Sequence, residues 1–225
     1  MKKSFLIITL TAVFFPLFTI RAFSQSATTS GTLQTKVTIE KSFTFSISGL
    51  KNNEFVNLGN KGCTNSEKTN SGYNASSSKI DFGNLSFSKI NISGQVIKIT
   101  RNEPGGYTLL ASSSGYLRNA KKSFDIPSSK EPSVITTGNA FFGIHPCGRD
   151  VDSMVWGQGK TGIKNQAKYA WPYKTSLVVA KNNGTGLIGE GEEGVISLEY
   201  GSTISKNTPS GAYTTSIIFT ALPNF

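Results

Sequence analysis

The chain has 225 residues, with 23 lysines and arginines against 13 acidic residues, so its formal net charge is +10. The basic residues are scattered, and even the densest group, at 118–122, holds only three of them. Binding to nucleic acid needs a denser basic stripe, so we expect no nucleic-acid partner. With only two cysteines and one histidine the chain is also poor in metal ligands, and we expect neither a metal nor a cofactor.

The N-terminus has the pattern of a secretory signal peptide. Lys2 and Lys3 precede an apolar run at 5–20, and Ala22-Phe23-Ser24 then forms a small-x-small cleavage site. An uncleaved membrane anchor is the alternative, but the run is only about 16 residues long and contains Pro16, whereas a span needs roughly 20. No later run is apolar enough to span. We therefore predict a signal peptide at 1–24 and one secreted domain at 25–225, either soluble or attached to the cell surface.

Apolar residues alternate with a period of two along most of the remaining chain, and helix-period patterning is almost absent. The strands predicted in this way, in chain order, cover residues 33–39, 43–47, 79–87, 95–101, 107–111, 140–144, 175–180, 195–200 and 211–222. Gly, Asn and Ser separate these short runs. The pattern predicts an all-β fold, an antiparallel β-sandwich of the Ig-like, Greek-key type with long loops.

Turn residues suggest how some of these strands are connected. The turn Asn102–Gly106 lies between two alternating runs and predicts a hairpin over 95–112. Residues 195–200 and 211–222 are expected to form a closing pair of strands. A long polar loop is expected at 60–78, and residues 150–174, which contain both tryptophans, are expected to form an irregular insertion.

The two cysteines are Cys63, in the polar loop, and Cys147, next to a predicted buried strand. An even cysteine count in an exported chain favours a disulfide, here closing a loop of about 84 residues. Such a bridge would contribute on the order of 4 kcal/mol in the chain-entropy model. The alternative is two free thiols.

Few residues are candidates for catalysis. A Ser/His/Asp triad would have to use His145, with Asp150 or Asp152 as the orienting acid, and no Gly-x-Ser-x-Gly motif is present. A structural role for His145 is the better interpretation. The loop acids Glu190, Glu192, Glu193, Asp150 and Asp152 match no defined calcium loop and are interpreted as solvated. We therefore predict no catalytic residues and no enzyme activity.

Four aromatic residues of the predicted insertion, Trp156, Tyr169, Trp171 and Tyr173, are the candidate ligand-binding residues. Aromatic rings on loops can stack on the apolar face of a sugar. This predicts a carbohydrate site. The alternative is that the four rings close one open end of the sandwich as part of its core.

Three segments carry a resemblance to a known family. They are Phe82-Gly83 after an early strand, Ile99-Thr-Arg-Asn102 followed by Gly105-Gly-Tyr-Thr-Leu-Leu110, and the closing run Pro209 to Thr220. In this order they resemble the WxL-type cell-surface domains of Gram-positive bacteria, and the closing run is similar to that of spore-coat and fimbrial-subunit-like sandwiches. The resemblance implies a secreted sandwich that sits on or binds the cell envelope. The chain lacks the Trp-x-Leu motif, so no family binding residue is transferred.

The leading functional hypothesis is a non-enzymatic secreted or cell-surface protein with a structural or adhesive role at the bacterial envelope. One alternative is a module that binds carbohydrate or wall polymers. Another is a fimbrial-type subunit that assembles by strand addition. The expected partners are cell-wall polymers, glycans or other surface proteins, and the sequence leaves the oligomeric state open.

Overall fold

A computed structural model describes residues 42–56, 67–102, 105–159, 166–184 and 194–224, all within the compact unit that spans 41–225. The elements in chain order are β1 (Phe43–Gly49), β2 (Asn91–Arg101), β3 (Tyr107–Ser113), β4 (Leu117–Asn119), β5 (Phe124–Ile126), β6 (Phe141–Cys147), α2 (Ser153–Trp156), β7 (Ser176–Asn182), β8 (Val195–Thr203) and β9 (Ile217–Pro223).

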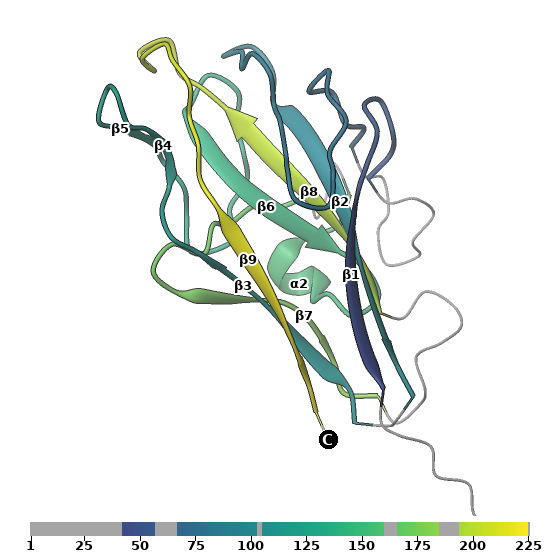
Figure 1. Cartoon of the computed structure of the whole chain (residues 1–225). Coiled ribbons are helices and arrows are strands. Elements are labelled where there is room, and N and C mark those ends of the chain that lie inside the picture. Colours follow the sequence, from purple (N-terminus) through teal and green to yellow (C-terminus); the bar gives the residue numbers. More distant parts are fainter. Residues whose placement is uncertain (1–41, 57–66, 103–104, 160–165, 185–193, 225) are drawn as a thin grey trace, which may run out of the picture. The chain divides into compact units, whose positions relative to one another are not determined.

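Two sheets and a small hairpin hold these strands (Figure 1). One sheet has the order β1-β2-β8-β6, the other has the order β7-β3-β9, and β4 pairs with β5. Every pair of these strands is antiparallel. The sheets pack against each other, so the prediction of an all-β antiparallel sandwich is confirmed.

The main core lies between the two sheets. Alternate residues of the central strands fill it, including Ile97 and Ile99 of β2, Leu198 of β8, and Tyr107 and Leu109 of β3. All five are buried, as the alternation of apolar side chains in the sequence predicts. Burial of apolar area at roughly 25 cal/mol per Å² is the main stabilising contribution here.

The second face of the four-stranded sheet is covered as well. Leu50 and Val56 pack on Ile92 and Val96 of β2, and a further cluster around Tyr169 covers the other end of the sheet. The outward face of the three-stranded sheet is open instead. There Val178 is 51 % and Ile218 is 62 % exposed. The two sheets therefore differ: most of β2 and β8, the central strands of the four-stranded sheet, is buried on both faces, whereas the three-stranded sheet is buried on one face.

The predicted hairpin over 95–112 is wrong, because β2 and β3 belong to different sheets. The intervening turn carries the chain across the sandwich. Gly106 in this turn has φ +93°, and a Cβ built on it would lie 1.8 Å from the carbonyl oxygen of Asn182. The expected closing pair is wrong for the same reason, because β8 and β9 also lie in different sheets. A period of two shows which side chains are buried but does not choose a strand's neighbour.

Other strand predictions fail for local reasons. Residues 79–87 form no strand, because the Asp81 carboxylate accepts the Gly83 N–H at 2.9 Å and Gly83 adopts φ +57°. The bond from Gly83 and the nearby Lys79 ammonium lower the pKa of the Asp81 carboxyl. The sequence also missed the hairpin of β4 and β5. The predicted strand at 33–39 lies outside the described residues.

Candidate functional site

The aromatic residues predicted to bind carbohydrate are mostly core residues. Trp156, Tyr169 and Trp171 are at most 3 % exposed. The indole N–H of Trp171 donates to the Gly115 carbonyl at 2.8 Å, and its ring packs on Phe142 at 4.4 Å between centroids. These three rings have no face free to stack on a sugar. This corrects the hypothesis of an exposed aromatic site and matches the alternative that the rings complete the core.

The fourth aromatic residue, Tyr173, is half-buried. Its ring lies 4.2 Å from that of Tyr116 between centroids, and the ammonium of Lys174 lies 5.2 Å from its centroid. The tyrosine therefore packs against the edge of the main core. It does not join the three buried rings into one exposed platform.

The residues considered for a catalytic triad have separate structural roles. His145 is buried in β6, with its Nδ1 facing the Lys168 carbonyl at 3.2 Å, and burial lowers the pKa of His145 to about 4. Asp152 is the N-cap of α2 and accepts the N–H of Met154 at 2.9 Å. Neither aspartate orients the imidazole in the hydrogen bonds that the structure describes.

Asp150 joins three strands. Its carboxylate accepts the Tyr107 hydroxyl of β3, the side-chain amide of Asn182 at 2.9 Å, and the Gly194 N–H next to β8 at 2.9 Å. Its carbonyl accepts the Lys181 N–H at 2.8 Å. A carboxylate that accepts these three hydrogen bonds has a structural role. The part of the predicted insertion that contains Asp150 is therefore an integral part of the sandwich.

No group of three or more metal-ligating side chains occurs among the described residues. Glu190, Glu192 and Glu193, interpreted as solvated loop acids, lie outside the part of the chain that the structure describes. Cys147 is buried in β6, and Cys63 is likewise outside the described ranges. The bridge between the two cysteines therefore stays a prediction.

One buried pair of titratable residues, Tyr169 and Glu199, was not predicted from the sequence. The Tyr169 hydroxyl donates to Oε1 of Glu199, which is 1 % exposed on β8. Burial raises the pKa of Glu199 to about 8, and the nearby Glu67 carboxylate adds to this while the bond from Tyr169 opposes it. Glu199 is therefore mostly protonated at neutral pH. The signal in the sequence is an acidic residue inside a run that otherwise reads as a buried strand.

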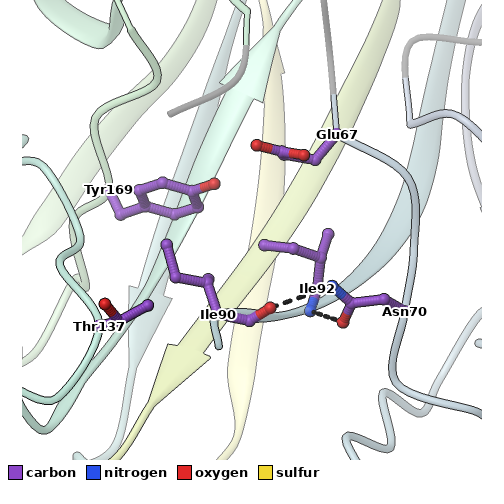
Figure 2. A pocket seen from close by; sticks show the side chains of 6 residues that line it. All are labelled: Glu67, Asn70, Ile90, Ile92, Thr137 and Tyr169. Atoms are coloured by element: carbon purple, nitrogen blue, oxygen red, sulfur yellow. Dashed lines mark hydrogen bonds between the residues drawn. The ribbon is translucent and has the colours of Figure 1, made fainter. Parts of the chain in front are cut away.

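A small hollow has Tyr169 of this pair in its lining (Figure 2). It has a volume of about 240 Å³ and is lined by Glu67, Asn70, Ile90, Ile92, Thr137 and Tyr169. The side chain of Asn70, one of the lining residues, donates to the Ile90 carbonyl at 3.0 Å and accepts the Ile92 N–H at 2.8 Å. The hollow has room for a small polar group, but the Asn70 amide and the Tyr169 hydroxyl in its lining already bond to the protein, and Glu67 is the one charged residue among those that line it.

The most distinctive surface feature is instead one open side of the sandwich. On the opposite side the segment after β6 closes the gap between the sheets: α2 packs against β6, and Lys181 of β7 bonds to the Asp150 carbonyl. Trp156 and Val151 of this segment are buried in the main core. The remaining edges of the two sheets are β1 and β9 (Figure 1).

The inward-facing side chains of β1 are incompletely covered. Phe45 and Ile47 are in register with Ile99 and Ile97 of β2, which are buried, so all four side chains point to the same side of the sheet. Even so, Phe45 is 37 % exposed, and Ile47 is only half-buried. Phe43 and Ile47 touch the main core, but like Phe45 they remain partly exposed.

The inward-facing side chains of β9, in the other sheet, are also incompletely covered. Its residues Ile217, Phe219 and Ala221 are in register with Ser113, Ala111 and Leu109, and the last two are fully buried. The three β9 side chains touch the main core but remain partly exposed. Within the described residues β1 pairs only with β2, and β9 only with β3. We call this opening, with Phe43, Phe45, Ile47, Ile217, Phe219 and Ala221 along it, the open edge.

Comparison with family models, with curated proteins and with solved structures gave no match to this chain. In the described part of the chain, no helix is long and apolar enough to cross a membrane.

Proposed function

We propose that this chain is a non-enzymatic, secreted structural protein of the bacterial envelope, and that it assembles with its partners by adding a strand at the open edge. The observation that carries the proposal is that β1 and β9, one edge strand from each sheet, both leave core-facing apolar side chains partly exposed. The fimbrial-type alternative from the sequence is thus the one that the geometry favours.

An unpaired strand edge is a ready template for another strand. It presents free N–H and C=O groups, and natural proteins usually cover it or protect it with charge or proline. Along β1 the residues are Phe, Thr, Ser, Ile and Gly, with no charged residue and no proline. β9 has no charged residue either, and its one proline, Pro223, is its last residue. An added strand would pair with the backbone and cover the exposed side chains.

The non-enzymatic part of the proposal is supported by the roles of the polar groups. Asp150 and Asp152 are used in structural hydrogen bonds, and His145 is buried and neutral at pH 7. Export is supported by the N-terminal pattern of basic, apolar and small residues. Expression with the native N-terminus should place the mature chain outside the cytoplasm, and recovery of an uncleaved cytoplasmic product would contradict this part.

The test of assembly uses the secreted chain and a variant at the open edge. Phe45→Lys places a charge where an incoming strand would lie, while the long side chain can still reach water in the isolated subunit. The matched control is Ser46→Lys, on the opposite face of β1. Sedimentation velocity should show concentration-dependent assembly for the wild type and Ser46→Lys, and monomers for Phe45→Lys. A wild type that stays monomeric at every concentration would refute strand addition.

A further inference from the structure

We infer that this protein binds an anionic polysaccharide over the hollow that Glu67 lines, on the second face of the four-stranded sheet. This binding site goes beyond the proposed function, because it is separate from the open edge. Ile92 in the lining of the hollow packs with Leu50 and Val56 on the second face of the sheet, whereas Phe45 at the open edge is on the side of the main core. A strand received at the open edge would therefore leave the hollow uncovered.

Two exposed phenylalanines near the hollow each have a lysine ammonium over the ring. The Lys68 Nζ lies 4.6 Å from the ring centroid of Phe55, and the Lys206 Nζ lies 5.6 Å from that of Phe87. Even so, Phe55 is 51 % and Phe87 is 47 % exposed. Each pair thus presents apolar ring area and a positive charge at the same place.

A third lysine lies at the hollow itself. The Lys89 Nζ is 3.5 Å from the carbonyl oxygen of Asn70, which is one of the lining residues, and Lys89 directly precedes another lining residue, Ile90. On the other chain segment, Lys68 directly follows Glu67, which also lines the hollow. Two lysines are therefore immediate neighbours of the residues that form it.

The second phenylalanine is connected to the hollow through a loop. The carbonyl oxygen of Phe87 lies 4.0 Å from the position of a Cβ built on Gly138, which follows the lining residue Thr137. The two phenylalanines and the three lysines thus belong to one surface around the hollow. We call this surface the lysine–aromatic surface, and its residues are Phe55, Lys68, Phe87, Lys89 and Lys206.

The lining of the hollow suits a single sugar residue (Figure 2). Its volume of about 240 Å³ is below the roughly 300–1,000 Å³ of sites for larger ligands. Ile90 and Ile92 offer apolar contact to the C–H face of a sugar ring. The Glu67 carboxylate and the Thr137 hydroxyl can bond to sugar hydroxyls, and the Asn70 amide, which has two donor hydrogens and two lone pairs, uses one of each within the protein.

The charges around the hollow favour an anionic polymer over a neutral one. The three lysines of the lysine–aromatic surface are exposed, against the one carboxylate of Glu67 in the lining. Of the neighbouring acids, Glu54 accepts the Lys51 N–H at 2.8 Å, and Asp81 pairs with Lys79 at 3.1 Å. Exposed lysines attract a polyanion from a distance, and salt screens this attraction.

A lipid surface is a poorer partner for these residues. Proteins that lie on a membrane bury a continuous apolar face in the headgroup region. Here each exposed ring has its own lysine over it, and the hollow is lined partly by polar side chains. Sugar rings joined in a charged polymer offer both apolar faces and negative charges at short intervals, which is the combination that the lysine–aromatic surface can contact.

The first experiment measures binding of the secreted chain to carboxymethyl dextran by titration calorimetry, with unmodified dextran as the uncharged match. The double variant Lys89→Ala with Lys206→Ala should bind carboxymethyl dextran more than about tenfold more weakly than the wild type. The control, Lys98→Ala with Lys181→Ala, removes two exposed lysines elsewhere and should bind within about twofold of the wild type. Equal weakening by both pairs would show attraction by net charge alone and would overturn the inference.

The second experiment tests the aromatic contact. Phe87→Ala should weaken binding to carboxymethyl dextran by about fivefold or more, because the ring area is lost, whereas Phe87→Tyr keeps the ring and should bind like the wild type. Both variants change an exposed side chain, and unchanged circular dichroism would show that they are folded. Binding by Phe87→Ala that equals that of the wild type would contradict the proposed contact.

The outcomes separate this inference from strand addition. The Phe45→Lys subunit should bind carboxymethyl dextran as the wild-type subunit does, and a wild type that binds but never assembles would leave the inference standing while strand addition fails. Loss of binding in Phe45→Lys would overturn the inference. It would also be overturned if the wild type bound dextran equally well, or bound vesicles of phosphatidylglycerol and neither polysaccharide, or bound none of the three.

Discussion

At the scale of single residues, two glycines show how differently one residue type can be constrained. Gly106 turns the chain from one sheet to the other with φ +93°, and an added Cβ would lie 1.8 Å from a backbone oxygen. Gly115 has no atom within 4 Å of the same position. Neither strain nor collision is therefore expected at Gly115.

Gly106→Ala should destabilise the protein strongly, by about 3 kcal/mol or more, because the backbone at Asn182 cannot move without disturbing β7. Gly115→Ala should change the free energy of unfolding by less than about 1 kcal/mol. Chemical denaturation of both variants measures the difference. Equal effects would contradict the close approach of the two backbones.

The buried Glu199 makes stability depend on pH. Its pKa is about 8 in the folded chain against an ordinary value of 4.5, so the folded state binds more protons than the unfolded state between these values. The contribution of Glu199 is fully present below pH 4.5 and is lost as the pH rises through about 8. His145 acts in the opposite sense, because its pKa is lowered from 6.5 to about 4, and its contribution is lost as the pH falls through that range.

Glu199→Gln should therefore be more stable than the wild type in alkaline solution, since glutamine cannot ionise and still accepts a bond from Tyr169. The window from pH 6.5 to 8 isolates this effect from His145. There the advantage of the variant should grow with pH, by up to about 1.4 kcal/mol per unit. Urea denaturation across this window measures the slope, and parallel curves for the two proteins would argue against a protonated Glu199.

At the scale of elements, burial divides the strands into two groups. β2 and β8 are central and covered on both faces, whereas β1 and β9 are edge strands with half of their side chains in water. Local opening requires less free energy where fewer apolar contacts are broken. The strands that we assign to assembly are thus the less stable ones in the isolated subunit.

Hydrogen exchange should reproduce this division. In the monomeric Phe45→Lys subunit, amides of β2 and β8 should exchange slowest, while those of β1 and β9 should exchange much faster. In the assembled wild type, β1 and β9 should gain protection and the central strands should change little. Protection gained elsewhere, for example only on β7, would place the interface on another surface.

At the scale of the whole molecule, the expected bridge between Cys63 and Cys147 would tie the polar loop to β6. It would restrict the unfolded chain across about 84 residues, which stabilises the folded state by on the order of 4 kcal/mol. Reduction should lower the denaturation midpoint accordingly. Alkylation of the unfolded, unreduced protein should add no label, and labelling of two thiols would show that the bridge does not form.

The sequence determined the fold class and much of the core. Alternation in runs such as 95–101 and 195–200 identified strands whose inward residues are buried, because a strand's own geometry places every second side chain on one face. The glycine and proline residues around Gly106 also identified a turn from the sequence. They did not show that the turn leads into the other sheet.

The tertiary structure alone decided the pairing of the strands and the character of the sites. Whether β2 continues into a hairpin or crosses to the other sheet depends on contacts between residues far apart in the chain. Trp171 is a core residue because Phe142 packs on its ring and the Gly115 carbonyl accepts its N–H, and none of these is its neighbour in sequence. Alternation shows that β1 and β9 have an apolar face. Which strands remain at an edge, with that face uncovered, is decided only when both sheets are assembled.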